Sequence, residues 1–174
     1  MHDTTALDPR TPVLVGVGQV EQRAEDPADA IEPIELLAEA ARAAAADAGA
    51  PALLGALDSI AVPCILTWTY PDAAAALAAR IGAEPRQTIA TDPGGNYPQL
   101  LINRAAREIQ EGSADVVLVG GAECGRTASR ARKLGVPLPW RAQEPGPTPT
   151  LSHADAHEMW HREEWVHQVI APVT

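Results

Sequence analysis

The sequence predicts an α/β fold in which a mainly parallel sheet carries helices on both faces. Short apolar runs alternate with longer segments whose apolar residues recur at helical spacing, in the order strand–helix–strand–helix–strand–helix–strand. This alternation is typical of parallel strands joined by right-handed helical crossovers. The chain has 174 residues, of which 46% are hydrophobic, so it can bury the core of one domain.

The strands are predicted from four apolar runs, each bounded by proline, glycine or polar residues. The first run follows Pro12, ends in Gly16-Val17-Gly18, and is expected to be a buried strand. The last run is followed by Gly120. The predicted strands are residues 13–18, 57–63, 87–91 and 115–119.

The helices are predicted from apolar stripes between recognisable start and stop signals. Pro33 in a first turn opens the first helix, and Gly49 ends it in the C′ position. Asp72 caps the second helix and Gly82 stops it. The predicted helices are residues 32–49, 72–82 and 97–111.

The chain is expected to have four parts. Residues 1–11 form a polar leader, and residues 12–125 form the α/β domain. Residues 126–150 are rich in arginine and proline, which predicts a loop region. Residues 151–174 are predicted to be helical up to about Ile170, after which the chain ends directly behind an apolar run. This ending suggests a truncated chain.

Charge and cysteine content exclude several classes of function. The net charge of −10 argues against binding to nucleic acid or to anionic membrane surfaces. No apolar run approaches the ~20 residues of a membrane span, and the N-terminus lacks the apolar core of a signal peptide. Two cysteines, Cys64 and Cys124, do not make a disulfide framework. Their number is typical of a reducing compartment, so a cytoplasmic location is expected.

A resemblance to a known family rests on several segments taken in order. Arg10-Thr11-Pro12 precedes the first predicted strand, and the turn 92–96 (DPGGN) precedes the third predicted helix. That helix ends in REIQEG, and ADVVLVGGAE follows it. Over residues 10–125 the chain resembles the N-terminal half of the thiolase superfamily, the acetyl-CoA acetyltransferases of lipid metabolism. Within that superfamily it is most similar to sterol-carrier-type thiolase-like proteins.

The resemblance implies a departure from the chemistry of thiolases. Thiolases place a nucleophilic cysteine at the start of the third helix, where the helix N-terminus and a histidine lower the pKa of its thiol. In this chain Gly95 occupies that position, and the C-terminal motifs that carry the histidine and the second base are missing. The chain is therefore predicted to have no catalytic residue of its own and to be inactive as a thiolase.

The same resemblance implies a coenzyme A thioester as ligand and no covalently bound cofactor. Gly94, Gly95 and Asn96 are candidate ligand-binding residues, because free N–H groups at a helix start can face a thioester or phosphate oxygen. Ordinary turn and capping chemistry explains these three residues equally well. Arg126 and Arg130 are candidates for contacting nucleotide phosphates, with a solvated loop as the alternative.

Three functional interpretations stay open within this resemblance. The chain is an acyl-CoA-handling fragment of an acyltransferase, a non-catalytic acyl-CoA-binding or scaffold subunit, or part of a retro-aldol C–C lyase that acts on a CoA thioester. The family pairs its subunits at the third strand, so a homodimer is expected through the strand from Gln87 to Thr91. A missing C-terminal half or a partner chain is also expected.

Two further motifs suggest other functions. The residues HEMWH at 157–161 match the zinc motif H-E-x-x-H, which makes a zinc hydrolase a remote alternative. Glu164 stands where the extended motif needs glycine, and the chain ends seven residues after His167, so no metal site is predicted. Gly16-Val17-Gly18 suggests a dinucleotide-binding turn, but Glu21 replaces the third glycine, which favours a tight strand end.

Overall fold

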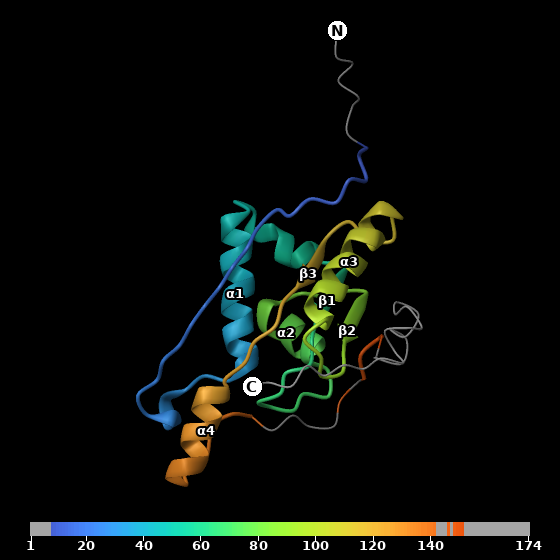
Figure 1. Cartoon of the computed structure of the whole chain (residues 1–174). Coiled ribbons are helices and arrows are strands. Elements are labelled where there is room, and N and C mark those ends of the chain that lie inside the picture. Colours follow the sequence, from blue (N-terminus) through green and yellow to red (C-terminus); the bar gives the residue numbers. More distant parts are fainter. Residues whose placement is uncertain (1–7, 142–145, 147, 152–174) are drawn as a thin grey trace.

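The centre of the molecule is a three-stranded parallel sheet (Figure 1). The computed structural model describes residues 8–141, 146 and 148–151. Strand β1 lies in the middle, and Ser59 at its start is opposite Gln87 of β2 and Val117 of β3. The strands are β1 (Ser59–Val62), β2 (Gln87–Ala90) and β3 (Val117–Val119). The parallel sheet and its helical crossovers confirm the predicted fold class.

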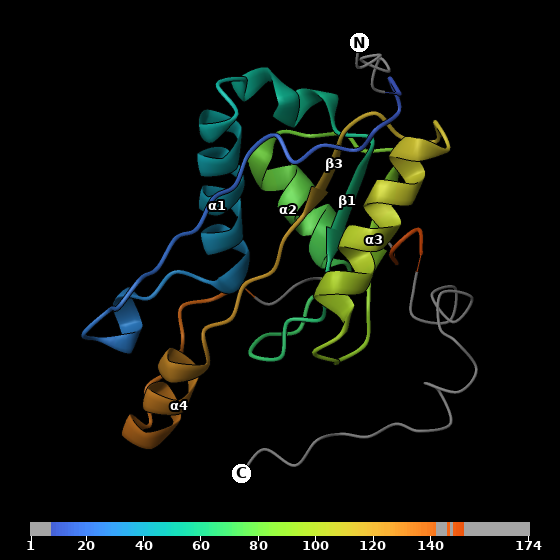
Figure 2. The same ribbon diagram turned by 45° about the horizontal axis from the view of Figure 1, so that its top comes forward.

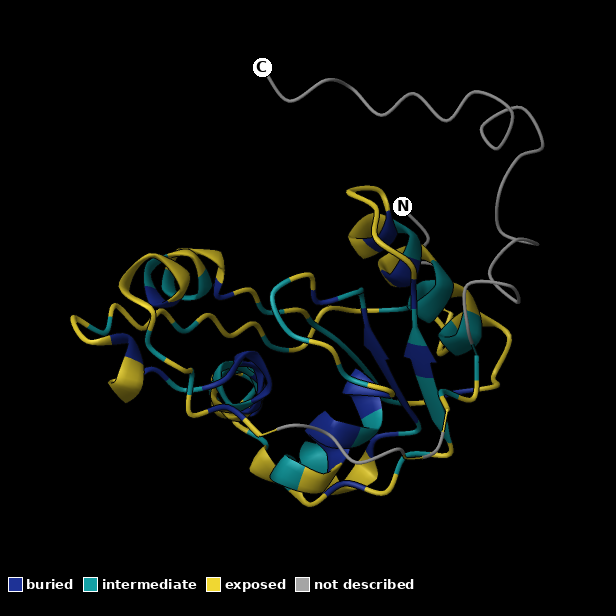
Figure 3. Ribbon diagram, turned by 90° about the horizontal axis from the view of Figure 1, so that it is seen from below, coloured by how far each residue is buried: buried dark blue, intermediate teal, exposed yellow. Residues whose placement is uncertain are grey.

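Helices cover both faces of this sheet. Figure 3 shows α1 and α2 on one face and α3 on the other, whereas α4 lies away from the sheet. Two short 3-10 helices, η1 and η2, precede and follow α1. The helices are η1 (Pro27–Asp29), α1 (Pro33–Asp47), η2 (Pro51–Ala56), α2 (Ala73–Ile81), α3 (Tyr97–Gln110) and α4 (Gly125–Leu134).

The predicted helix ends are confirmed at α1 and α2. The Asp72 carboxylate accepts a hydrogen bond of 2.9 Å from the backbone N–H of Ala75, as an N-cap does. Gly82 ends α2 in the left-handed conformation at φ 70°, and Gly49 follows α1 at φ 65°. Left-handed φ values cost glycine little, so both sites stop a helix without strain.

The core lies mainly between the sheet and the α1/α2 layer. All four residues of β1 are buried, which explains why polar and apolar residues do not alternate along this strand. Ile60 and Val62 pack with Ile34, Leu37 and Leu77 of the two helices. On the other face, Leu101 of α3 packs with Ala61 and Ile89.

The expectation of a buried first strand at residues 13–18 is wrong. The segment is extended, but it forms no strand with the described residues, and its valines and leucine are 57% to 84% exposed. It runs along α1 instead, as Figure 2 shows. A Cβ atom on Gly16 would lie 2.2 Å from the carbonyl oxygen of Ala44, and one on Gly18 would lie 2.1 Å from that of Ala40. The two glycines therefore let the segment approach the helix backbone closely.

The prediction of a loop at residues 126–150 is wrong for residues 126–134. Residues Gly125–Leu134 form α4, which ends at Gly135 with φ 67°. The arginines, lysine and alanines that suggested a solvated loop are also good helix formers, which explains the difference. The predicted C-terminal helix begins at 151, and its residues from 152 lie outside the described residues, as does most of the predicted leader at 1–11.

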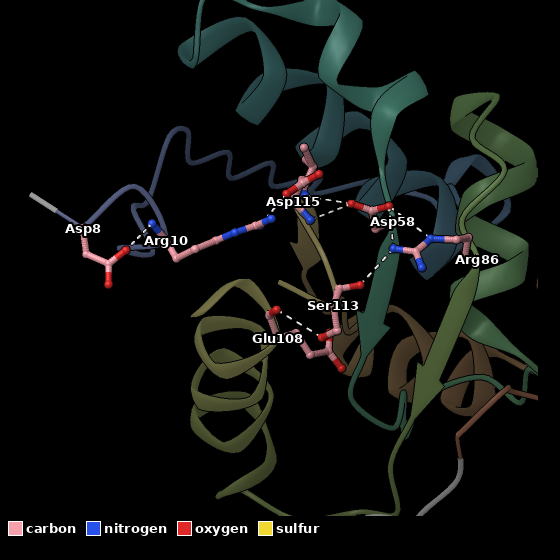
Figure 4. A network of polar contacts seen from close by, with 8 residues as sticks. Asp8, Arg10, Asp58, Arg86, Glu108, Ser113 and Asp115 are labelled. Atoms are coloured by element: carbon pink, nitrogen blue, oxygen red, sulfur yellow. Dashed lines mark hydrogen bonds and ion pairs between the residues drawn. The ribbon is translucent and has the colours of Figure 1, made fainter. Parts of the chain in front are cut away.

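A polar network holds the amino ends of the three strands together (Figure 4). The Asp58 carboxylate accepts hydrogen bonds from the backbone N–H groups of Asp115 and Val116, at 2.7 and 3.1 Å. It also accepts a 2.8 Å bond from Arg86, which donates to the carbonyl oxygen of Ser113 as well. These bonds lower the pKa of Asp58, with the N–H of Asp115 as the largest cause.

Candidate functional site

The carboxyl ends of the three strands meet at one edge of the sheet, where parallel α/β folds place their ligand sites. Hydrogen bonds tie the loops that follow these strands to each other. The Thr91 hydroxyl accepts a 3.2 Å bond from the backbone N–H of Cys64. The Glu123 carboxylate accepts bonds of 2.6 and 3.2 Å from the N–H groups of Leu66 and Thr67. The edge is therefore a fixed framework of three loops.

The turn from Gly94 to Asn96 belongs to this edge and leads into α3. Its three residues are exposed, as a ligand-facing turn requires. A Cβ atom on Gly95 would meet nothing within 4 Å among the described residues, whereas one on Gly94 would lie 2.8 Å from the ring of Tyr97. Asn96 occupies the N-cap position without a side-chain capping bond. Gly94 is thus needed for packing, and Gly95 faces open space.

The two candidate arginines lie on α4, apart from the α3 N-terminus in Figures 1 and 2. Arg130 has a structural role, because its guanidinium donates to the carbonyl oxygens of Ala24 and Glu25 and so holds the loop before α1. Arg126 is exposed and lines a hollow of about 370 Å³ together with Glu21 and Cys124. The structure brings together Gly94, Gly95 and Asn96, but it does not bring either arginine to them.

Neither cysteine has the environment of a nucleophile. Burial, followed by the negative charges of Glu123 and Asp92, raises the pKa of the Cys64 thiol above its ordinary value. Burial and Glu123 raise the pKa of Cys124 to about 11. Both thiols therefore stay protonated near neutral pH, whereas a nucleophilic cysteine needs a lowered pKa.

An apolar groove of about 600 Å³ lies beside the outer edge of β3, between α1 and α3. The extended segment 12–18 forms one wall, and Ile102, Ala106 and Ile109 of α3 form another. No described residue of its lining has a polar or charged side chain. The groove extends to Gly120 and Gly121, at the carboxyl end of β3. Its size and composition are those of a small-molecule pocket for an apolar group.

The zinc motif lies outside the described residues, as do all 5 histidines of the chain. Among the residues that the structure describes, no three acidic, cysteine or histidine side chains are grouped so that they could hold a metal ion. Within the same residues, no helix has the length and apolar character needed to cross a membrane.

Several residues at the carboxyl edge of the sheet were not predicted from the sequence. Glu123 and Thr91 bind backbone N–H groups of the loop after β1, more than twenty residues away in the sequence. No motif marks such contacts, because they depend on which strands are neighbours. The GAE sequence after the predicted fourth strand was the one available signal, since a carboxylate at the carboxyl end of a parallel strand faces this edge.

The comparisons with known proteins support the fold and little beyond it. No protein-family model matches the sequence, and no curated protein matches it. A solved structure does match, that of a monomeric SCP2-thiolase-like protein type 1 from Mycobacterium smegmatis. The TM-score is 0.55 and the sequence identity 36%, over 64% of this chain and 23% of that chain.

The match has consequences for two predictions. This chain spans less than a quarter of that protein, so the position of the match within a thiolase subunit and the activity stay predictions. That protein is described as monomeric, and the homodimer expected through Gln87 to Thr91 also stays a prediction. The likeness at 36% identity and the parallel α/β sheet together establish that this chain has a thiolase-like fold.

Proposed function

We propose that this chain is an acyl-CoA-handling protein of thiolase type that binds a CoA thioester and has no thiolase activity of its own. The observation that carries the proposal is the exposed turn at Gly95, which begins α3 at the carboxyl edge of a thiolase-like sheet. The resemblance places the thiolase nucleophile at this turn, where this chain has only hydrogen as a side chain. The turn keeps the open space that a thioester needs and lacks the reacting atom.

The environments of the two thiols support the absence of thiolysis. A substitute nucleophile would need a thiolate near neutral pH. The pKa of Cys64 is raised, and that of Cys124 is raised to about 11. The two cysteines also lie in other loops than Gly95, because Gly95 follows β2, whereas Cys64 follows β1 and Cys124 follows β3.

The apolar groove supports the binding of the acyl part of the ligand. It offers about 600 Å³ lined by apolar side chains, and it reaches the carboxyl edge at Gly120 and Gly121. An acyl chain of medium length fits such a volume, and burial of its methylenes contributes about 0.8 kcal/mol each. We therefore expect affinity to rise with chain length.

Isothermal titration calorimetry with octanoyl-CoA and with free CoA tests the binding. We expect octanoyl-CoA to bind at least tenfold more tightly than CoA, a difference of about 1.4 kcal/mol. Ile102→Asp introduces a charge into the groove at a half-exposed site and should remove this difference. Leu134→Asp is the matched control, because Leu134 is also a large exposed apolar residue of a helix, at the end of α4 and outside the groove lining.

The outcome has two separate parts. The proposal would be overturned if neither octanoyl-CoA nor free CoA binds. It would also be overturned if the two bind with equal affinity and Ile102→Asp leaves both affinities unchanged. Conversion of acetoacetyl-CoA and free CoA into two molecules of acetyl-CoA by the purified chain would overturn the claim that it has no thiolase activity. The zinc hydrolase stays a prediction, because its motif at 157–161 lies outside the described part of the chain. The retro-aldol lyase also stays a prediction.

A further inference from the structure

Apolar side chains are exposed on two walls of the groove beside β3. On the wall formed by the segment 12–18, Val13, Leu14 and Val17 are 61% to 84% exposed. On the α3 wall, Ile102 is 52% exposed. Among the described residues β3 pairs with β1 alone, so the strand edge along the groove is open as well. Exposed apolar surface of this kind, gathered in one place, marks a site that another group covers.

The last described residue, Leu151, lies on the face of the sheet that α3 covers. It forms a parallel bridge with Ile89 at the outer edge of β2. Its side chain packs against the apolar cluster that includes Ile89 and Leu101 of α3. Val119 of β3 packs against the same cluster and also lines the groove. Residues 152–174 therefore continue from a point on the same side of the sheet as the α3 wall of the groove.

The sequence that follows Leu151 carries an apolar stripe that suits this groove. The stripe recurs at positions i, i+1, i+4 and i+5 of the predicted C-terminal helix, which places its members on one helical face: Trp165, Val166, Val169 and Ile170. Pro172 follows directly, as a stop signal does. An amphipathic helix that lays its apolar face into a hydrophobic groove is a common mode of recognition.

The link between Leu151 and the stripe is long enough to reach the groove. Strands β2 and β3 stand on either side of β1, so they are about 10 Å apart. A path over α3, whose diameter is about 10 Å, adds a similar distance. Residues 152–164 span about 20 Å as a helix and about 45 Å when extended. Trp165 can therefore pass from the outer edge of β2 to that of β3.

We propose that the segment 165–170 docks in the groove of its own chain and shields it until an acyl chain displaces the segment. The docking stands by itself, whereas the shielding rests on the proposed function. A buried tryptophan removes 150–250 Å² of surface from water, roughly, which makes Trp165 the main anchor. Because the segment belongs to the same molecule, its effective concentration at the groove is in the millimolar range, and a second copy competes poorly with it.

Methyl NMR of the full chain without ligand tests the docking. We expect nuclear Overhauser contacts between the methyl groups of Ile102 and those of Val169 or Ile170. Val166→Asp places a charge in the stripe and should remove these contacts and shift the Ile102 signal. Gln168→Asp is the matched control, because it adds the same charge two residues later on the other face of the predicted helix. It should leave the contacts and the signal unchanged.

Two results would overturn the docking. One is a wild-type chain that shows no such contacts and whose Ile102 signal does not move in Val166→Asp. The other is a set of contacts that arises only between labelled and unlabelled chains in a mixed sample, because a second copy would then occupy the groove. The signals of Ile34 and Ile60, in the core on the α1/α2 side, show that each variant is folded.

Calorimetry with octanoyl-CoA tests the shielding separately. Val166→Asp should bind octanoyl-CoA at least tenfold more tightly than the wild-type chain, whereas Gln168→Asp should bind it as the wild-type chain does. Equal affinities of Val166→Asp and the wild-type chain would overturn the shielding. If octanoyl-CoA binds to none of the three chains, the proposed function and the shielding both fail, and the Overhauser contacts still decide the docking.

Discussion

The Oδ2 atom of Asp58 accepts a hydrogen bond of 2.7 Å from the backbone nitrogen of Asp115. Asp58 stands directly before β1, and Asp115 stands two residues before the start of β3. The same carboxylate binds Arg86, which stands directly before β2. One side chain therefore aligns the starts of all three strands. It lies at the amino edge of the sheet, opposite the candidate site.

Asp58→Asn should lower the free energy of unfolding by about 1–3 kcal/mol, because hydrogen bonds to a charged acceptor become bonds to a neutral one. The backbone N–H of Asp115 and the Arg86 side chain lower the pKa of Asp58 in the folded chain. Its stabilisation is therefore complete above the unfolded pKa of about 3.9 and is lost as pH falls through the lower folded pKa. Urea unfolding of both chains between neutral and acidic pH checks this.

The difference between wild type and Asp58→Asn should shrink as the solution becomes more acidic. Asp29→Asn is the control, because Asp29 is exposed in η1 and its carboxylate makes no hydrogen bond in the described part of the chain. An equal loss of stability in both variants would contradict the role given to Asp58.

Gly16→Ala should destabilise the chain by about 1–3 kcal/mol, the usual cost of overpacking. The new Cβ would lie 2.2 Å from the carbonyl oxygen of Ala44, so the segment 12–18 has to move away from α1. Thermal unfolding measures the effect, and Gly55→Ala is the control, since a Cβ there would meet no described residue within 4 Å. Equal melting temperatures of the two variants would show that the segment does not lie against α1.

The two native thiols should react slowly with iodoacetamide near neutral pH. The pKa of Cys64 is raised by burial and by Glu123 and Asp92, and that of Cys124 is raised to about 11. Alkylation of Cys64 should therefore keep accelerating above pH 9, and that of Cys124 up to about pH 11. Peptide mass spectrometry after timed alkylation separates the two sites. A rate for Cys64 that levels off near pH 7 would contradict its assignment as an inert thiol.

Gly95→Cys should place a more reactive thiol at the turn before α3. No described atom lies within 4 Å of a Cβ at this position, and the N-terminus of a helix stabilises a thiolate. We expect alkylation at neutral pH to be severalfold faster than at Cys64. Gly55→Cys, equally unobstructed but within a short 3-10 helix, is the control. Equal rates at the two introduced thiols would show that the turn does not favour an anion.

The sequence predicted the elements whose signals are local. Asp72 and Gly82 set the ends of α2, and the buried run around Ile60 predicted β1, because caps and short apolar runs act through nearby backbone. The segment 13–18 has the same apolar signal as a buried strand. Its position beside α1 depends on how closely Gly16 and Gly18 approach that helix, which no local pattern reveals.

The candidate site was predictable only where it coincides with a turn. Gly94, Gly95 and Asn96 are consecutive, so a sequence motif can mark them. Arg126 and Arg130 looked free in the sequence, but Arg130 is used to hold the loop at Ala24, more than one hundred residues earlier. The contacts of Glu123 with the loop after β1, and of Leu151 with β2, likewise follow from the order of strands in space.

The most direct test of the proposed function is a map of octanoyl-CoA on the protein by methyl NMR. The account predicts that octanoyl-CoA shifts the signals of Ile102, Leu118 and Val119, which line the groove, and that free CoA leaves them in place. Ile34 and Ile60, buried in the core on the α1/α2 side, serve as internal references. Signals of the groove that do not move when octanoyl-CoA is added in excess would contradict the account.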